Sequence, residues 1–291
     1  MIPPQFEYVR PPDLDAALAI LRDREGEAKV LAGGYSLLPL LKLRLASPAL
    51  LVDLRDVEGI DRISQTDEEL RVGGRATHRK ILEDPIVARY FPLFHDAAGG
   101  IGDPQIRNWG TIGGSCAHAD PAADWPAVLI ASNATIVVRS ASAERTVPAR
   151  EFFIDTFVTA IEPTEILTEI RVPRPPHGSG GAYQHLERRS GDFSTVGVGV
   201  QLRLDEAGTI ADIGIGVTAV APAAFAATHA EDLLRGAEPT DELIAQAGDA
   251  VAAQADPTTD GHGPAEYKRA MAREMTVRAL RLALARARGQ A

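Results

Sequence analysis

Two glycine pairs beside hydroxyl side chains most constrain how this chain can fold. The first lies in Ala32–Ser36 (AGGYS), between a short apolar segment and an apolar stretch typical of a helix. The second lies in Thr111–Ser115 (TIGGS), directly before Cys116. Glycine reaches positive φ and lacks the Cβ that would block a ligand. Successive N–H groups in such bends converge on anionic oxygens. Two such turns facing each other would hold a pyrophosphate.

Neither turn has the spacing of the common nucleotide-binding motifs. G-x-G-x-x-G and G-x-x-x-x-G-K-[ST] are both absent here, which disfavours the Rossmann and P-loop interpretations. Glycine pairs also occur at 73–74, 99–100 and 180–181. Each pair taken alone is therefore more typical of an ordinary tight turn.

The apolar pattern predicts two units before a Pro- and Gly-rich linker at 173–181. Leu14, Ala17, Leu18 and Leu21 form one helical face behind Asp13, a candidate N-cap. With strands at 29–32 and 49–54, they predict an α/β subdomain over residues 1–55. The second α/β subdomain, 56–175, is expected to hold strands at 70–73, 134–139 and 166–172. Its helices are expected at 77–83, 86–99 and 122–131, with a glycine turn at 111–115.

The pattern changes to a period of two after the linker. Apolar residues at 196, 198, 200, 202 and 204 alternate with small or polar ones, which predicts a strand with one buried face. A second alternation at 213–217 completes a hairpin. Helices are expected at 239–255 and 264–287. This third subdomain, an antiparallel sheet with helices, is assigned to 176–291.

Composition excludes several classes of protein. The net charge of −10 argues against a nucleic-acid binder, which needs a basic face. No apolar run approaches the roughly 18 residues of a membrane span, and no signal peptide is visible. The single cysteine, Cys116, cannot form an internal disulfide, a Cys-rich zinc site or an iron–sulfur cluster. We therefore expect a cytoplasmic protein.

Two segments carry a resemblance to a known family. Residues 29–45 (KVLAGGYSLLPLLKLRL) and 105–127 (QIRNWGTIGGSCAHADPAADWPA) resemble the FAD-binding medium subunit of molybdenum hydroxylases, the xanthine dehydrogenase and aerobic carbon monoxide dehydrogenase family. The likeness covers nearly the whole chain, including RRSGDFSTVGVGV and PAEYKRAMA. It implies an α+β, PCMH-type FAD-binding fold with noncovalent FAD between the first two subdomains.

The resemblance also implies which residues bind FAD. The residues matching the two diphosphate loops are Ala32, Gly33, Gly34, Tyr35, Ser36, Leu37, Leu38, Thr111, Ile112, Gly113, Gly114 and Ser115. Tyr35 stands where some relatives have histidine, and both stacking and surface packing are open for it. Valine at Gly33 or Gly114 would fill the space of the pyrophosphate and abolish binding.

Five further positions match the family outside these loops. Asp124 matches an acid that binds the ribose or adenosine part, the alternative being a carboxylate at a helix N-terminus. Ile101 and Leu167 match apolar residues that flank the flavin or adenine, and Phe193 an aromatic beside the isoalloxazine. Core packing is the alternative for all three. His185 takes the place of a family lysine and is not reliably cationic at pH 7.

No catalytic residue or metal site is expected. His118, Asp120 and Asp124 do not have the spacing of a zinc site, and Asp120 is the better helix cap. Cys116 could attach a flavin covalently, but a buried hydrophobic role is favoured, because the family binds FAD noncovalently.

The resemblance implies an electron relay. FAD in this chain would receive electrons from molybdopterin and [2Fe-2S] centres, held by a large molybdenum subunit and a small iron–sulfur subunit. It would pass them to NAD, a quinone or oxygen. A dimer of heterotrimers is expected. The alternatives are a stand-alone flavoprotein oxidase or dehydrogenase, and an assembly protein that has lost FAD. The organic substrate and the acceptor stay open.

Overall fold

In the computed structural model, which describes residues 2–290, the N-terminal segment forms a parallel three-stranded sheet. Its order is β1-β3-β2, with strands β1 (Glu7–Val9), β2 (Ala28–Leu31) and β3 (Leu50–Asp53). Helix α1 (Leu14–Asp23) is capped by Asp13 and buries Ala17, Leu18 and Leu21, as predicted. Helix α2 (Leu37–Lys42) and a 3-10 turn (Leu54–Asp56) follow the carboxyl ends of β2 and β3.

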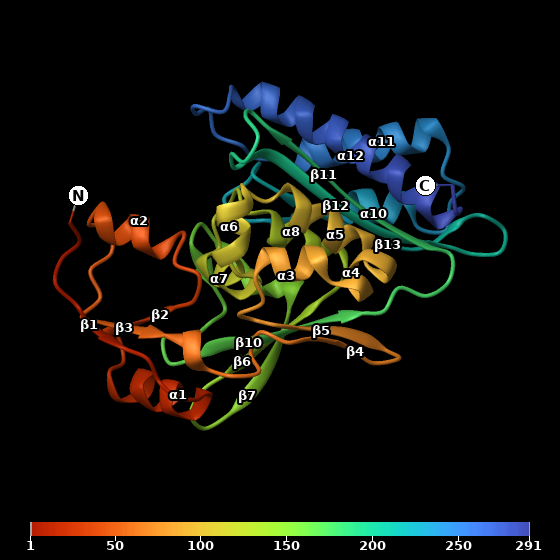
Figure 1. The fold of residues 1–291 in the computed structure, drawn as a ribbon. Coiled ribbons are helices and arrows are strands. Elements are labelled where there is room, and N and C mark those ends of the chain that lie inside the picture. The colour runs from red at the N-terminus through yellow and green to blue at the C-terminus, as the bar shows by residue number, and fades with distance from the viewer. Residues whose placement is uncertain (1, 291) are drawn as a thin grey trace.

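The middle segment is an antiparallel five-stranded sheet with helices stacked on one face (Figure 1). The sheet order β4-β5-β10-β6-β7 comprises β4 (Ile63–Gln65), β5 (Glu69–Gly73), β10 (Ile166–Pro173), β6 (Thr135–Arg139) and β7 (Glu144–Pro148). The helices are α3 (His78–Glu83), α4 (Pro85–Tyr90), α5 (Pro92–Gly100), α6 (Pro104–Trp109), α7 (Ile112–His118), α8 (Asp124–Ala131) and α9 (Ala149–Phe152). A small ribbon pairs β8 (Phe153–Asp155) with β9 (Val158–Thr159).

Three predictions for this segment are wrong in detail. The helix expected at 86–99 is two helices, because Pro92 restricts Phe91, which adopts φ −129° and ψ 61° between them. The expected turn at 111–115 is the first turn of α7, with Thr111 as its N-cap. Asp120 does not cap α8; its carboxylate accepts from the N–H of Ala122 in the preceding turn.

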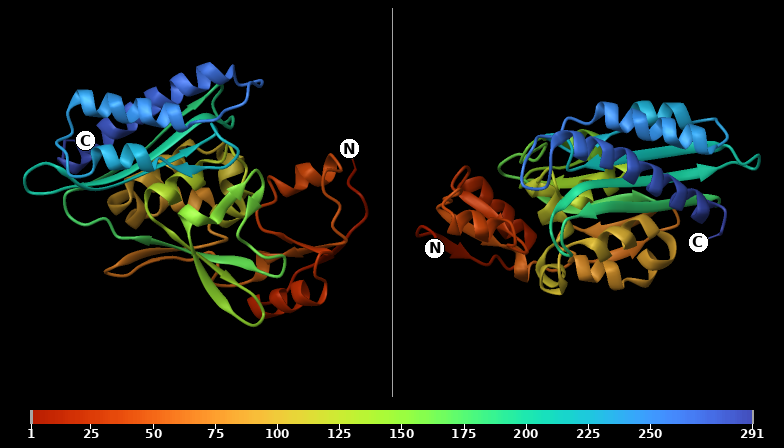
Figure 2. Two further views of the ribbon diagram at one scale, coloured as in Figure 1. Left: turned by 180° about the vertical axis from the view of Figure 1, so that it is seen from behind. Right: turned by 90° about the horizontal axis from the view of Figure 1, so that it is seen from above.

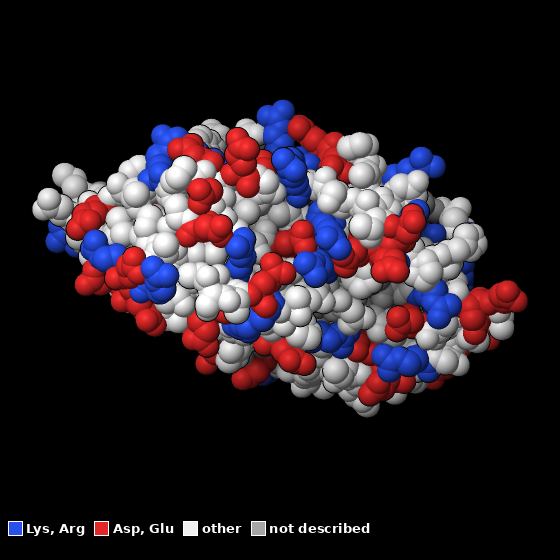
Figure 3. Space-filling view, turned by 90° about the horizontal axis from the view of Figure 1, so that it is seen from below, with Lys and Arg blue, Asp and Glu red and all other residues white. Residues whose placement is uncertain are grey.

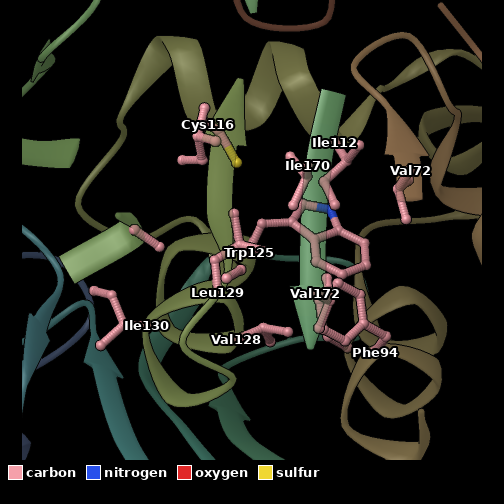
Figure 4. Packing of buried hydrophobic residues seen from close by; sticks show 14 of the residues in the cluster. Val72, Phe94, Ile112, Cys116, Trp125, Val128, Leu129, Ile130, Ile170 and Val172 are labelled. Atoms are coloured by element: carbon pink, nitrogen blue, oxygen red, sulfur yellow. The ribbon is translucent and has the colours of Figure 1, made fainter. Parts of the chain in front are cut away.

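The core of the middle segment surrounds the fully buried Trp125 on α8. Figure 4 shows its indole among Phe94, Ile112, Ile170 and Val172. These side chains come from two helices and a strand, so the core joins the helical layer to the sheet. The loops that begin α7 and α8 are thereby held on a rigid base.

The C-terminal segment adds a second antiparallel sheet, β11-β12-β13-β14, with helices on its outer face (Figure 2). Its elements are β11 (Ser179–Glu187), β12 (Ser194–Leu204), β13 (Ile210–Thr218), β14 (Phe225–Ala226), α10 (Thr228–Leu234), α11 (Asp241–Gln254) and α12 (Ala265–Ala287). The helices of the middle segment lie against the other face, so two sheets and two helical layers alternate. Because β11 begins at 179, the connection between the sheets is shorter than the predicted linker.

The strand at 194–204 has two buried faces, so the prediction of one was wrong. Its valine face packs against α12, whereas its glycine face lies under α8. A Cβ built on Gly216 of β13 would lie 2.0 Å from the Ala127 carbonyl oxygen of α8, and one on Gly214 2.1 Å from that of Ala131. Glycine thus lets helix and sheet backbones touch here. The subdomain boundaries 1–55, 56–175 and 176–291 stay a prediction.

The exposed face of the middle sheet carries charges of both signs. Figure 3, seen from this side, shows Lys and Arg interspersed with Asp and Glu. Residues two apart on one strand form ion pairs, Arg71–Glu69 on β5 and Arg171–Glu169 on β10, both at 2.7 Å. None of the helices in residues 2–290 is long and apolar enough to cross a membrane.

Candidate functional site

The first glycine loop lies at the carboxyl end of the parallel sheet, where ligands of such sheets usually bind. Gly34 has φ +85°, which glycine adopts readily. The backbone N–H groups of Gly33, Gly34, Tyr35 and Ser36 donate to no acceptor within residues 2–290. Four consecutive unpaired donors around a left-handed glycine form the kind of concavity that holds anionic oxygens.

The second glycine loop is built differently. The N–H of Ile112 donates to the Ala76 carbonyl at 3.0 Å, and that of Gly113 to the Gly74 carbonyl at 2.8 Å. The Thr111 hydroxyl accepts from the N–H of Gly114 at 3.1 Å. These amides are already paired, so the expectation that the N–H groups of this second turn converge on anionic oxygens was wrong. A Cβ on Gly113 would lie 2.4 Å from the Gly74 oxygen, so this glycine serves close backbone packing.

The two glycine loops nevertheless lie side by side. A Cβ on Gly33 would lie 2.1 Å from the carbonyl oxygen of Trp109, just before the second loop. A Cβ on Gly114 would lie 4.0 Å from the Cβ of Ala32. Valine at Gly33 would therefore push the loops apart, and valine at Gly114 would strike the Thr111 hydroxyl at 2.7 Å. Both clashes are with the protein itself, a reason other than the one expected from the sequence.

A second cluster centres on Asp124, the first residue of α8. Its Oδ1 accepts hydrogen bonds from the Tyr183 hydroxyl at 2.5 Å and the Ser194 hydroxyl at 2.6 Å. His185 Nδ1 lies 3.4 Å from the same oxygen and 3.0 Å from the Ser194 hydroxyl. The cluster joins α8 to β11 and β12. Charge-assisted bonds of this kind are the strong class of hydrogen bonds in proteins.

The cluster determines the charge of its members. The hydrogen bond to Asp124 raises the pKa of His185 above its ordinary value, although burial opposes the shift. Burial, with the neighbouring Asp124 carboxylate, raises the pKa of Tyr183 well above 10. Tyr183 therefore stays a neutral donor, and His185 gains cationic character near neutral pH.

The sequence did not single out Tyr183 or Ser194. A signal was present for Tyr183, because residues two apart on a strand share a face and His185 was already a candidate. Ser194 precedes the alternating segment and had no such signal. It meets Asp124 only because α8 packs on the sheet.

The remaining predicted residues lie around the glycine loops and the Asp124 cluster. Ile101 is the C-cap of α5 and directly follows Gly100. A Cβ built on Gly100 would lie 2.9 Å from His185 Nε2. Leu167 is buried on β10, and its carbonyl oxygen faces Gly74. Tyr35 and Leu38 are exposed near the first glycine loop, with Leu37 partly buried beside them. Phe193 is exposed in the loop before β12. Among the predicted residues outside the glycine loops, Asp124 and His185 are in direct contact with each other.

Cys116 fits the role of a buried hydrophobic residue. It is fully buried in the core of Figure 4, and burial raises the pKa of its thiol. A reactive cysteine needs an accessible thiolate, which this environment disfavours. His118 stacks against Phe157, with ring centroids 4.9 Å apart. Across residues 2–290, no group of three or more His, Cys, Asp or Glu side chains is placed to hold a metal ion.

Comparisons with known proteins agree along almost the whole chain. Residues 4–175 match the family model described as the FAD binding domain in molybdopterin dehydrogenase, and residues 181–283 match the CO dehydrogenase flavoprotein C-terminal domain. The carbon monoxide dehydrogenase medium chain of Hydrogenophaga pseudoflava is 41% identical, over 98% of this chain and 99% of that one. The 6-hydroxypseudooxynicotine dehydrogenase complex subunit alpha of Paenarthrobacter nicotinovorans is 39% identical, over 99% and 97%.

Solved structures give the same picture. A chain of the Hydrogenophaga pseudoflava carbon monoxide dehydrogenase lacking the Mo-pyranopterin moiety superimposes with a TM-score of 0.96, at 43% identity, over 98% of this chain and 99% of that one. A chain of quinoline 2-oxidoreductase from Pseudomonas putida 86 gives a TM-score of 0.91 at 32% identity, over 100% and 99%.

Proposed function

The chain belongs to the family of FAD-binding medium subunits of molybdenum hydroxylases, and from this we propose that it is an electron-transfer subunit. It would relay electrons from molybdenum and [2Fe-2S] centres in partner chains to an external acceptor. The observation that carries the proposal is the run of unpaired N–H groups at Gly33–Ser36. A loop with free donors at the carboxyl end of a parallel sheet suits a diphosphate.

The residues of this loop fit the proposed cofactor. Gly33 and Gly34 keep the concavity open, and the N–H groups through Ser36 can donate to phosphate oxygens. The second glycine loop, 111–115, would form the opposite wall, with the Ser115 hydroxyl as a further donor. Bound FAD supplies the exchange of two electrons, which this chain can bind and tune but does not itself perform. We place Ala32, Tyr35, Leu37, Leu38, Ile101, Leu167 and Phe193 around it as contacts.

The Asp124 cluster would position the part of the cofactor beyond the diphosphate. Asp124 Oδ1 is already shared by Tyr183 and Ser194, so its second oxygen is the one left to accept a sugar hydroxyl. His185 Nδ1 faces this carboxylate, and its Nε2 lies above Gly100. We assign to His185 the hydrogen bond and partial positive charge that a lysine supplies in other members of the family.

The partners follow from what this chain lacks. Its single cysteine cannot hold an iron–sulfur cluster, so those centres must lie in other chains. We propose a large molybdenum subunit and a small iron–sulfur subunit, in a dimer of heterotrimers. Relatives of similar identity are named for carbon monoxide, 6-hydroxypseudooxynicotine and glyceraldehyde. We therefore assign the choice of substrate to the molybdenum subunit.

The test is an absorption spectrum of the purified chain before and after acid precipitation. We expect a flavin band near ~450 nm that moves into the supernatant as FAD, because the environment binds the cofactor without a covalent bond. Co-purification with a large and a small chain would support the subunit over a stand-alone flavoprotein. A colourless chain that takes up no added FAD, alone or with its partners, would refute the proposal.

A further inference from the structure

Two arginines beside the first glycine loop have no role in the site described so far. Arg55 follows the carboxyl end of β3, and Arg75 follows β5 in the middle segment. Both line a cavity of about 240 Å³ that also touches Ala32, Trp109 and Thr111, and therefore both glycine loops. A site for one water needs only roughly 10–15 Å³, so this cavity has room for a larger group.

Neither guanidinium makes a hydrogen bond to the described residues of the protein; each has only a long ion pair to one carboxylate. Within residues 2–290 neither side chain donates a hydrogen bond, although each carries five N–H donors. Arg75 Nε is buried without a partner. The nearest carboxylates are 3.5 Å away in both cases, Asp53 for Arg55 and Asp61 for Arg75. Buried donors without acceptors are rare in folded proteins, and such a group calls for a ligand or an ordered water.

The two carboxylates near the arginines are already occupied. Asp53 Oδ2 accepts from the Tyr8 hydroxyl at 2.6 Å, and Asp61 Oδ2 is 3.0 Å from the Lys80 ammonium. Tyr8 is neutral, so Asp53 keeps its full charge, but Asp61 is shared between Arg75 and Lys80. Three cations therefore face two carboxylates, and one positive charge is not offset. The cavity keeps a positive character that an anion would complete.

The position of the cavity indicates which anion. The guanidinium of Arg55 lies over the Trp109 ring, 5.5 Å from its centroid, and the Trp109 carbonyl packs against Gly33. The arginines thus border the loop whose N–H groups are unpaired. We propose that Arg55 and Arg75 bind the diphosphate of FAD, completing the contacts of the first glycine loop. This inference rests on the proposed function and adds the residues that neutralise the phosphate charge.

The proposal predicts a dependence on the phosphate groups of the ligand. Guanidinium–phosphate contacts strengthen the binding of FAD and of ADP, which share the diphosphate. They contribute nothing to riboflavin, which has no phosphate. Binding of FAD should also weaken with added salt, because salt screens exposed charges.

The experiment titrates the flavin-depleted full chain with FAD, ADP and riboflavin, following flavin fluorescence directly or by displacement. We expect Arg75→Gln and Arg55→Gln each to weaken binding of FAD and ADP about tenfold to hundredfold, the range for a lost hydrogen bond to a charged group. Affinity for riboflavin should not change, and the salt dependence for FAD should become shallower. Arg62→Gln is the matched control, because Arg62 is exposed and lies outside the cavity.

The titrations separate the role of the two arginines from the proposed function. Arg55 is 49% exposed, so Arg55→Gln tests the proposal even where Arg75→Gln lowers the melting temperature. If the wild-type chain binds FAD and both variants bind it equally well, the arginine proposal is wrong while the proposed function stands. An equal loss of riboflavin binding would also overturn it, because a general distortion would then be the cause. If the wild-type chain binds no FAD, either alone or together with its partner subunits, the proposed function fails and this inference with it.

Discussion

The hydroxyl of Tyr183 offers the sharpest test of the Asp124 cluster. Tyr183→Phe removes one oxygen and keeps the ring, which is 4% exposed. The lost bond joins the hydroxyl to Asp124 Oδ1 at 2.5 Å. A Cβ on Gly197 would lie 2.2 Å from that hydroxyl, so the site is closely packed on that side. A hydrogen bond to a charged group contributes roughly 1.5–3 kcal/mol, and we expect a loss of about 2 kcal/mol in unfolding free energy.

A second tyrosine supplies a matched control. The Tyr8 hydroxyl donates to Asp53 Oδ2 at a similar distance, 2.6 Å, but the Tyr8 side chain is half exposed. Asp53 is itself buried, but after the loss of the Tyr8 hydroxyl it keeps the N–H of Arg55 on Oδ1 and the Arg55 guanidinium 3.5 Å from Oδ2. We therefore expect Tyr8→Phe to cost less than about 1 kcal/mol.

Urea unfolding of the flavin-free full chain would measure both variants under the same conditions. Equal losses, or a Tyr183→Phe variant as stable as the wild type, would refute the argument that the buried Asp124 cluster holds α8 to the C-terminal sheet.

Three further outcomes are expected. The raised pKa of His185, caused by its hydrogen bond to Asp124, contributes stability below about pH 6.5 that is lost as the pH rises through the folded-state pKa. The stability difference between wild type and His185→Gln should therefore be larger at pH 6 than at pH 9, and a constant difference in urea unfolding would contradict this. Burial lowers the pKa of His78 to about 4, so stability should fall by up to roughly 3 kcal/mol as the pH drops from 6.5 to 4. His78→Gln should flatten that acid limb in thermal unfolding; an unchanged limb would assign it to other groups. Gly216→Ala should destabilise the chain by at least about 1–3 kcal/mol, because its Cβ would overlap a carbonyl of α8, whereas Gly261→Ala, in open space, should be nearly neutral. Equal melting temperatures for these two variants would mean that α8 does not touch the sheet.

Local chemistry explains why much of the fold could be predicted. The helix behind Asp13 and the hairpin of β12 and β13 follow from apolar spacing within a few residues, and such spacing acts before any tertiary contact forms. The first glycine loop was recognisable because its residues suit an open anion-binding bend. The family resemblance likewise rested on short segments read directly from the sequence.

Contacts between distant segments explain what was missed. Two amides of the second glycine loop, those of Ile112 and Gly113, are paired with Ala76 and Gly74, more than thirty residues earlier, and no local pattern reports that. Asp124 finds Tyr183 and Ser194 only after the two sheets stack around α8.

The sequence by itself therefore determined the kind of cofactor loop and most of the elements that carry it. The tertiary structure alone decided which donors stay free. Gly33–Ser36 keep their N–H groups unpaired because the loop ends an open parallel sheet, whereas the N–H groups of residues 112–115 are paired with Ala76, Gly74 and Thr111. The same packing leaves Arg75 Nε buried without a partner and holds the nearest carboxylates 3.5 Å from Arg55 and Arg75. Burial and pairing are properties of the assembled layers, and a single segment cannot express them.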